Sequence, residues 1–164
     1  MVQKKWEKPP IVKVKVNFDA VISKDKIGFG VLARDNEGFV VGRSYGFRVE
    51  KTQVEWAKLH AFEDSIKVAS SMHTTNIIFE TDCTSLANRI RNRGVDITIM
   101  GQRINELFKS KDILKKAKFG WVNCNYNRAT NFMSKVDIAN NCNLNFGMDY
   151  PLTVHDFVIV DAIN

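Results

Sequence analysis

The residues with the clearest chemical meaning are cations gathered in one stretch of the chain. Residues 89–118 hold nine lysines and arginines against three acidic residues, and this excess of +6 equals the net charge of all 164 residues. Clustered cations attract phosphates by releasing counterions, so nucleic acid is the partner they favour. A solvated helix face kept soluble by its charge is the common alternative. The nine cations are Arg89, Arg91, Arg93, Arg103, Lys109, Lys111, Lys115, Lys116 and Lys118.

Thiol and zinc chemistry are not favoured by the remaining reactive residues. The three cysteines are an odd number without C-x-x-C spacing, which indicates free thiols in a reducing compartment. The three histidines lie too far apart to pair at helical metal-ligand spacing. Cys83 follows Asp82 near a predicted helix start, where its pKa can fall, but neither His nor Arg adjoins it in sequence. We therefore expect no catalytic thiol.

The first half of the chain must supply strands and one helix to position any site. Residues 12–19 alternate between apolar and polar types, which predicts a half-buried strand with Asp19 on its polar face. Turn signals at 23–26 and 36–38 separate this strand from two more, at 28–35 and 39–49, as in an antiparallel meander. Apolar residues then recur at helical spacing through 54–72, and Lys58 lies in that stripe.

The second half returns to strands and adds helices. Residues 77–82 predict a short strand with Glu80 and Asp82 on one face, and 119–125 predict a fifth strand. Helices are expected at 84–92, 99–108 and 131–140. The order is three strands, a helix, a strand, two helices, a strand and a helix. It predicts an α/β fold with a five-stranded mixed sheet and right-handed crossovers.

Composition indicates the class of protein, its location and its domain organisation. A content of 45% hydrophobic and 26% charged residues is that of a soluble globular protein. No apolar run approaches the roughly 18 residues of a membrane helix, and the first residues lack a secretory apolar core, so we expect a cytoplasmic or nuclear protein. The chain has no Lys or Arg after Lys135. We expect one domain over 1–142 and an Asn-rich, then acidic, C-terminal appendage over 143–164.

Short motifs occur in a fixed order along residues 6–161. Trp6 precedes KVNFDAV at 15–21, GFGVLARDNEG at 28–38, IIFETD at 77–82 and NRATNFMSK at 127–135, with Pro151 and Asp161 behind them. Together with the element order, they resemble the plant reverse-transcriptase-like ribonuclease H domain, which is often derived from retroelements. Each motif alone is weak, but the set in this order is specific. The resemblance implies a ribonuclease H-like fold.

The resemblance also implies a chemistry, the hydrolysis of phosphodiesters by two divalent metal ions. Magnesium prefers hard oxygen ligands, and in the family four carboxylates supply them from the first strand, first helix, fourth strand and last helix. Asp19 matches the first-strand carboxylate and Asp82 the fourth-strand one. An alternative interpretation is that Asp82 only caps the helix that begins near Thr84.

The other two carboxylates of the family are missing from the matching positions. Lys58 stands where the first helix should carry a glutamate, and Asn131 stands where the last helix should carry an aspartate. Glu55, one turn before Lys58, and Glu80 are the nearby acids that could partly substitute. The resemblance therefore predicts a degenerate nuclease site in which Asp19 and Asp82 remain, with no tightly bound metal; Mg²⁺ would be the cofactor if the site is active.

Three functions are compatible with these residues. The first is a catalytically inactive pseudo-nuclease that binds nucleic acid, either RNA/DNA hybrid or RNA. The second is an active Mg²⁺- or Mn²⁺-dependent RNA–DNA hybrid ribonuclease, and the third is a domesticated module that binds a protein partner. Trp121 and Tyr126 could stack on bases or sugars, although we favour a core strand position for Trp121. The residues predicted to bind nucleic acid are Arg89, Arg91, Arg93, Lys109, Lys111, Lys115 and Lys116.

Overall fold

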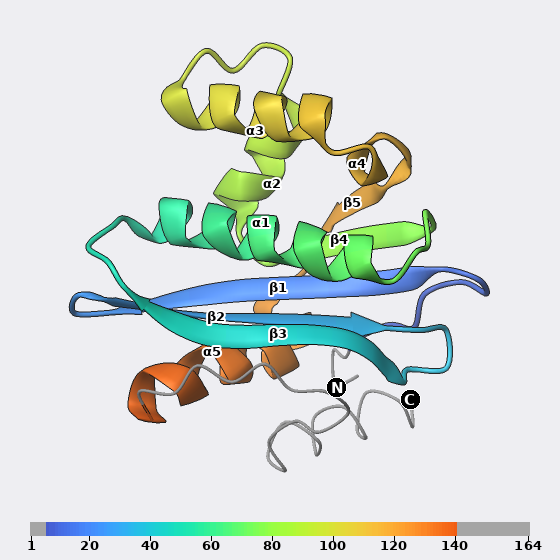
Figure 1. The fold of residues 1–164 in the computed structure, drawn as a ribbon, viewed down its shortest axis with the longest axis horizontal. Helices are drawn as coiled ribbons and strands as arrows, with labels where there is room; N and C mark the ends of the chain where they lie inside the picture. The colour runs from blue at the N-terminus through green and yellow to red at the C-terminus, as the bar shows by residue number, and fades with distance from the viewer. Residues whose placement is uncertain (1–5, 141–164) are drawn as a thin grey trace.

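A five-stranded mixed sheet organises the computed structural model, which describes residues 6–140 (Figure 1). Strands β1 (Val14–Ser23), β2 (Lys26–Arg34) and β3 (Val40–Val49) form the predicted antiparallel meander. Strands β4 (Ile77–Thr81) and β5 (Lys118–Trp121) run parallel to β1, so the order is β3-β2-β1-β4-β5. The predicted α/β fold is confirmed. The expected appendage at 143–164 lies outside the described residues.

Helices cover both faces of the sheet (Figure 1). Helix α1 (Val54–Ser71) packs on the meander, with α2 (Thr84–Arg91), α3 (Ile99–Ser110) and the short α4 (Ile113–Lys116) on its side. Helix α5 (Arg128–Asn140) packs on the opposite face, against β1, β2 and β3. Within the described part of the chain, no helix is both long and apolar enough to cross a membrane.

Aromatic residues form the centre of the core between the sheet and α1. The rings of Phe18 on β1 and Phe62 on α1 lie 5.3 Å apart, and Phe79 on β4 stacks on Phe119 of β5 at 5.5 Å. Burial of rings of this size is among the largest apolar contributions to folding that single side chains make. These contacts fix the rotation of α1, and so the direction from which Lys58 approaches the sheet, one turn before Phe62.

The prediction of a half-buried first strand is wrong, because both faces of β1 are buried. From Lys15 to Ala20 every residue is buried, including Asn17 and Asp19 on the face expected to be polar and exposed. Helix α5 covers that face over Asp19, and Trp6 covers it over Asn17, whose side-chain oxygen accepts a hydrogen bond from the indole at 3.0 Å. Alternation in a strand cannot reveal a second layer supplied from the far end of the chain.

Element boundaries shift where asparagine reshapes the backbone. Strand β5 ends at Trp121 rather than at residue 125, because the Asn123 side chain accepts from the Asn125 amide and begins the 3₁₀ helix η1 (Cys124–Tyr126). Helix α5 starts at Arg128, three residues early, with Asn127 accepting from the Thr130 hydroxyl and the Asn131 amide. Asparagine favours such turns and helix starts. Residue 131 therefore lies in the first turn of α5.

A glycine allows α5 to approach the sheet closely. Gly30 of β2 pairs directly with Asp19 of β1. A Cβ atom built on Gly30 would lie 2.7 Å from the Thr130 carbonyl oxygen and 2.8 Å from the Met133 Cβ. Only a residue without a side chain fits here, and the close contact brings the first turn of α5 within reach of Asp19.

Candidate functional site

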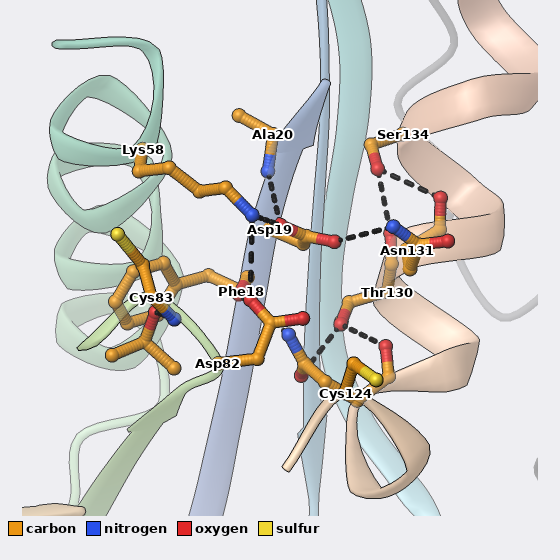
Figure 2. A network of polar contacts seen from close by, with 12 residues as sticks. Phe18, Asp19, Ala20, Lys58, Asp82, Cys83, Cys124, Thr130, Asn131 and Ser134 are labelled. Carbon is orange, nitrogen blue, oxygen red and sulfur yellow. Dashed lines mark hydrogen bonds and ion pairs between the residues drawn. The ribbon is translucent and has the colours of Figure 1, made fainter. Parts of the chain in front are cut away.

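Asp19 is the centre of a buried polar cluster at the middle of β1 (Figure 2). Its side chain is fully buried, and three donors surround its two oxygens. The Lys58 ammonium and the Ala20 amide donate to Oδ1, the latter at 2.8 Å, and the Asn131 Nδ2 donates to Oδ2 at 2.8 Å. A buried carboxylate requires such compensation, since burial removes its hydration.

Lys58 joins two carboxylates. Its ammonium forms ion pairs with Asp19 and, at 3.3 Å, with Asp82 Oδ1, and its side chain is only 14% exposed. Burial lowers the pKa of Lys58, but the neighbouring charges and hydrogen bonds of Asp19 and Asp82 outweigh this effect and raise the pKa above its ordinary value. Lys58 is thus held as a cation between the two carboxylates (Figure 2).

Asp82 lies immediately after β4, at the carboxyl end of the strand, where ligands normally approach a sheet. Burial first and the charge of Asp19 second raise the pKa of the Asp82 carboxyl, against the lowering effect of Lys58. The alternative that Asp82 caps α2 is not supported, since the N-cap residue is Cys83, which makes no side-chain capping bond. The structure therefore places Asp82 with the Asp19 cluster.

Two residues of the site escaped sequence reasoning, namely Asn127 and Thr130. The Asn127 amide donates to the Phe18 carbonyl at 3.1 Å, and its oxygen accepts from the Thr130 hydroxyl at 2.8 Å. These bonds tie the start of α5 to the residue before Asp19 and so hold Asn131 in place. The motif NRATN contains both residues, but a sequence does not tell which of its polar members point inward.

The two candidate replacement acids are bound elsewhere. Glu55 pairs with Arg89 of α2; burial alone would raise its pKa, but hydrogen bonds from Ser85 and Arg89 lower it overall. Glu80 accepts from Asn17 at 3.1 Å and pairs with Lys15 at 3.3 Å. Neither carboxylate has a described contact with the Asp19 cluster.

The predicted nucleic-acid-binding cations divide into two groups. Arg89 is partly exposed, but Glu55 and Asp96 both pair with its guanidinium and neutralise its charge. Lys115 pairs with the exposed Asp112 at 2.6 Å, and exposed ion pairs of this kind contribute little to the free energy of folding. The side chains that face solvent are, in whole or in part, Arg91, Arg93, Lys109, Lys111, Lys115 and Lys116.

The favoured core position of Trp121 is wrong. Trp121 ends the edge strand β5 and is 48% exposed, while its indole donates to the Asp82 carbonyl at 3.1 Å. A sequence alternation cannot tell an edge strand from a covered one. Tyr126 in η1 is partly exposed as well. Trp121 is therefore available for contacts beside the cluster.

Solved structures with the same fold include ribonucleases H and a reverse transcriptase. LC11-RNase H1, obtained from compost and solved in complex with RNA/DNA hybrid, is 11% identical with a TM-score of 0.69, over 79% of this chain and 99% of that one. RNase H1 of Halobacterium salinarum is 13% identical with a TM-score of 0.66, over 78% of this chain and 98% of that one. The foamy viral protease-reverse transcriptase, in complex with RNA/DNA hybrid, is 15% identical with a TM-score of 0.59, over 84% of this chain and 22% of that one. These similarities define a ribonuclease H-like fold.

The sequence identifies the family within that fold. The profile of the reverse transcriptase-like family matches residues 17–136, and the chain belongs to this family. No curated protein sequence is significantly similar to it. The matched range contains every member of the Asp19 cluster.

Proposed function

We propose that this protein binds nucleic acid, RNA/DNA hybrid or RNA, without cutting it. The observation that carries the proposal is the position of the Lys58 ammonium between Asp19 and Asp82. In the family, metal ions neutralise these carboxylates and activate water. Here the Lys58 ammonium, which is part of the chain itself, neutralises them. An ammonium group cannot activate a bound water as a metal ion does, and it is not a Lewis acid.

The residues of the cluster do not fit a two-metal centre. A divalent ion 4 Å from the Lys58 ammonium would be repelled by about 8 kcal/mol at an effective dielectric constant of about 20. Asn131 directs its amide nitrogen at Asp19, and a donor in this position opposes a metal ligand. Among residues 6–140, no group of three or more His, Cys, Asp or Glu is placed to hold a metal ion.

Nucleic-acid binding is supported by the surface beside this cluster. The exposed cations of α2, α3 and α4 can neutralise phosphates, and the exposed Trp121 can stack on a base. Two of the structural relatives were solved with RNA/DNA hybrid bound. In this proposal the fold and its exposed cations bind the nucleic acid, and the ion pairs of Lys58 in the Asp19 cluster prevent cleavage.

A cleavage and binding experiment tests the proposal. Labelled RNA/DNA hybrid is incubated with the protein in Mg²⁺ and then in Mn²⁺, beside an identically purified Asp82→Asn variant that reveals contaminating nuclease. We expect equal background cleavage by the two proteins. We also expect measurable hybrid binding, with the logarithm of the association constant falling linearly with the logarithm of the salt concentration, at a slope of about 0.9 per neutralised phosphate. Hybrid cleavage by the wild-type protein that is lost in Asp82→Asn would refute the proposal that the site is inactive.

A protein-interaction role is the second candidate, and one observation favours it. The loop between α2 and α3 and the first residue of α3 expose three aliphatic side chains, Val95 at 80%, Ile97 at 87% and Ile99 at 78%. Exposed apolar residues that cluster in this way are typical of contact surfaces. Absence of any hybrid or RNA binding at low salt would favour this role over the first.

Three finer assignments belong to the same proposal. We infer that the domain extends over 1–142 and is followed by an appendage at 143–164, since the last helix of the fold reaches Asn140. The order of the motifs supports descent from a plant retroelement. A cytoplasmic or nuclear location agrees with the free thiols of Cys83 and Cys124 within residues 6–140 and with a nucleic-acid partner.

A further inference from the structure

A cleft of about 400 Å³ opens between α2 and β5, on the side of the sheet opposite α5. Its wall is apolar, with the buried Phe79 of β4 and Ile90 of α2 and the partly buried Phe119 of β5. The volume lies within the range of small-molecule sites, which join an apolar wall to a few polar groups. Figure 1 shows α2 crossing above the sheet beside β5.

The exposed part of the cleft is cationic. Arg91 at the end of α2, Arg93 just after it and Lys118 at the start of β5 line the cleft, and its described lining residues include no carboxylate. Arg93 is held in place by a bond to the Ile90 carbonyl at 2.9 Å and by its position over the Phe108 ring, 4.1 Å from the ring centre. The charges of the cations that line the cleft can therefore bind an anionic ligand. The charge of Arg89, in contrast, is neutralised by two carboxylates.

A second basic side chain adds to this charge. A side-chain hydrogen bond with Lys118 first, and the Lys118 charge second, lower the pKa of Lys13, which lies outside the lining of the cleft. Two neighbouring ammonium groups repel each other, and a bound anion relieves the repulsion. Trp121, the exposed end of β5, also lines the cleft and bonds to the Asp82 carbonyl, so the cleft opens next to the Asp19 cluster.

We propose that this cleft binds one unpaired nucleotide, with its base against Phe119 and Trp121 and its phosphate at Arg91, Arg93 and Lys118. A base offers a flat apolar face, and its phosphate matches a cationic opening without carboxylates. A base within a duplex is stacked on its neighbours and cannot enter the cleft. The protein therefore prefers RNA with an unpaired overhang or bulge over a fully paired hybrid, and in this the inference rests on the proposed function.

Two labelled hybrids test the preference, one blunt and one with a single-stranded RNA overhang. We expect the overhang to bind about tenfold tighter, because stacking of one base on an aromatic residue is of that order. Ala87→Met, which fills the cleft from α2, and Arg91→Gln should each reduce this ratio towards one. Arg103→Gln removes the same charge from a side chain paired with Glu63 outside the cleft, and should leave the ratio unchanged. Equal binding of both hybrids by the wild-type protein overturns the inference and leaves the proposed function intact.

A titration with adenosine 5′-monophosphate tests the cleft independently of any oligonucleotide. In amide and indole NMR spectra, shifts are expected at residues 87–93 and 117–121, weaker with adenosine or inorganic phosphate alone, and lost in Ala87→Met. If neither hybrid binds, the proposed function fails, and this titration still decides the cleft: a spectrum unchanged at the Trp121 indole refutes it.

Discussion

Replacing Lys58 by methionine tests whether a built-in cation takes the place of metal in this fold. The substitution keeps a long apolar side chain on α1 and removes the charge. Asp19 is fully buried and would keep only two neutral donors, Ala20 and Asn131. Breaking a buried ion pair by removing one partner costs about 3–5 kcal/mol, and the 14% exposure of Lys58 favours the lower end, about 3 kcal/mol. At about 2–4 °C per kcal/mol, the melting temperature should fall by roughly 6–12 °C.

The same variant should respond to metal. Without Lys58, the carboxylates of Asp19 and Asp82 lack a counter-ion, and Mg²⁺ can bind between them. A ligand at 100 times its dissociation constant contributes about 2.7 kcal/mol, so Mg²⁺ should restore most of the lost stability in Lys58→Met. Wild-type protein should gain nothing comparable, because its ammonium occupies the position.

Urea unfolding with and without Mg²⁺ measures both effects. Lys67→Met is the matched control, since Lys67 lies on the same helix and pairs with Asp64 through a side chain that is 76% exposed. Loss of such a pair costs about 0–1 kcal/mol, with no Mg²⁺ response expected. A Lys58→Met variant as stable as wild type, or an equal Mg²⁺ response in both proteins, would refute the reasoning.

Three further predictions concern the same region. Since burial and Asp19 raise the pKa of Asp82 above its ordinary 3.8, the contribution of Asp82 to the free energy of unfolding should fall as the pH rises from 3.8 through the raised value. The difference between wild type and Asp82→Asn in urea unfolding should therefore change by this contribution across that range. Lys58→Glu with Asn131→Asp, which supplies four carboxylates, should gain Mg²⁺-dependent hybrid cleavage, and a double variant that folds, binds Mg²⁺ and does not cut would show that further groups are missing. Gly30→Ala should destabilise the protein by about 1–3 kcal/mol in thermal unfolding, because its Cβ meets the backbone of α5; an unchanged melting temperature would contradict the close contact.

Local pattern was sufficient for most of the elements. Alternation, helical stripes and turn signals gave the five strands and helices α1, α2, α3 and α5 in their observed order, since periodicity reflects burial of one face. The short helix α4 was not expected. Local pattern was insufficient where polar residues redirect the backbone. The end of β5 and the start of α5 depend on asparagine side chains that bond to nearby amides, and their effect on the chain is not periodic.

The site shows the same division. The register of the apolar stripe and the final motif were enough to predict that Lys58 and Asn131 stand where the resemblance implies a glutamate and an aspartate. The alignment could not tell that Lys58 bonds to both Asp19 and Asp82, or that Glu55 is withdrawn by Arg89. Side chains 39 and 24 residues apart meet only through the packing of α1 on the sheet.

By itself the sequence determined the order of the strands and long helices, the family, and the presence of Lys58 and Asn131 where the resemblance implies carboxylates, because these depend on residue type and spacing along the chain. Only the tertiary structure decided which cations are paired with carboxylates of the protein and which can bind a ligand. Arg89 and Arg91 are two residues apart and chemically identical, yet one is neutralised by Glu55 and Asp96 and the other lines an open cleft. The free energy of a charge depends on its neighbours in space and on its contact with water, and folding sets both.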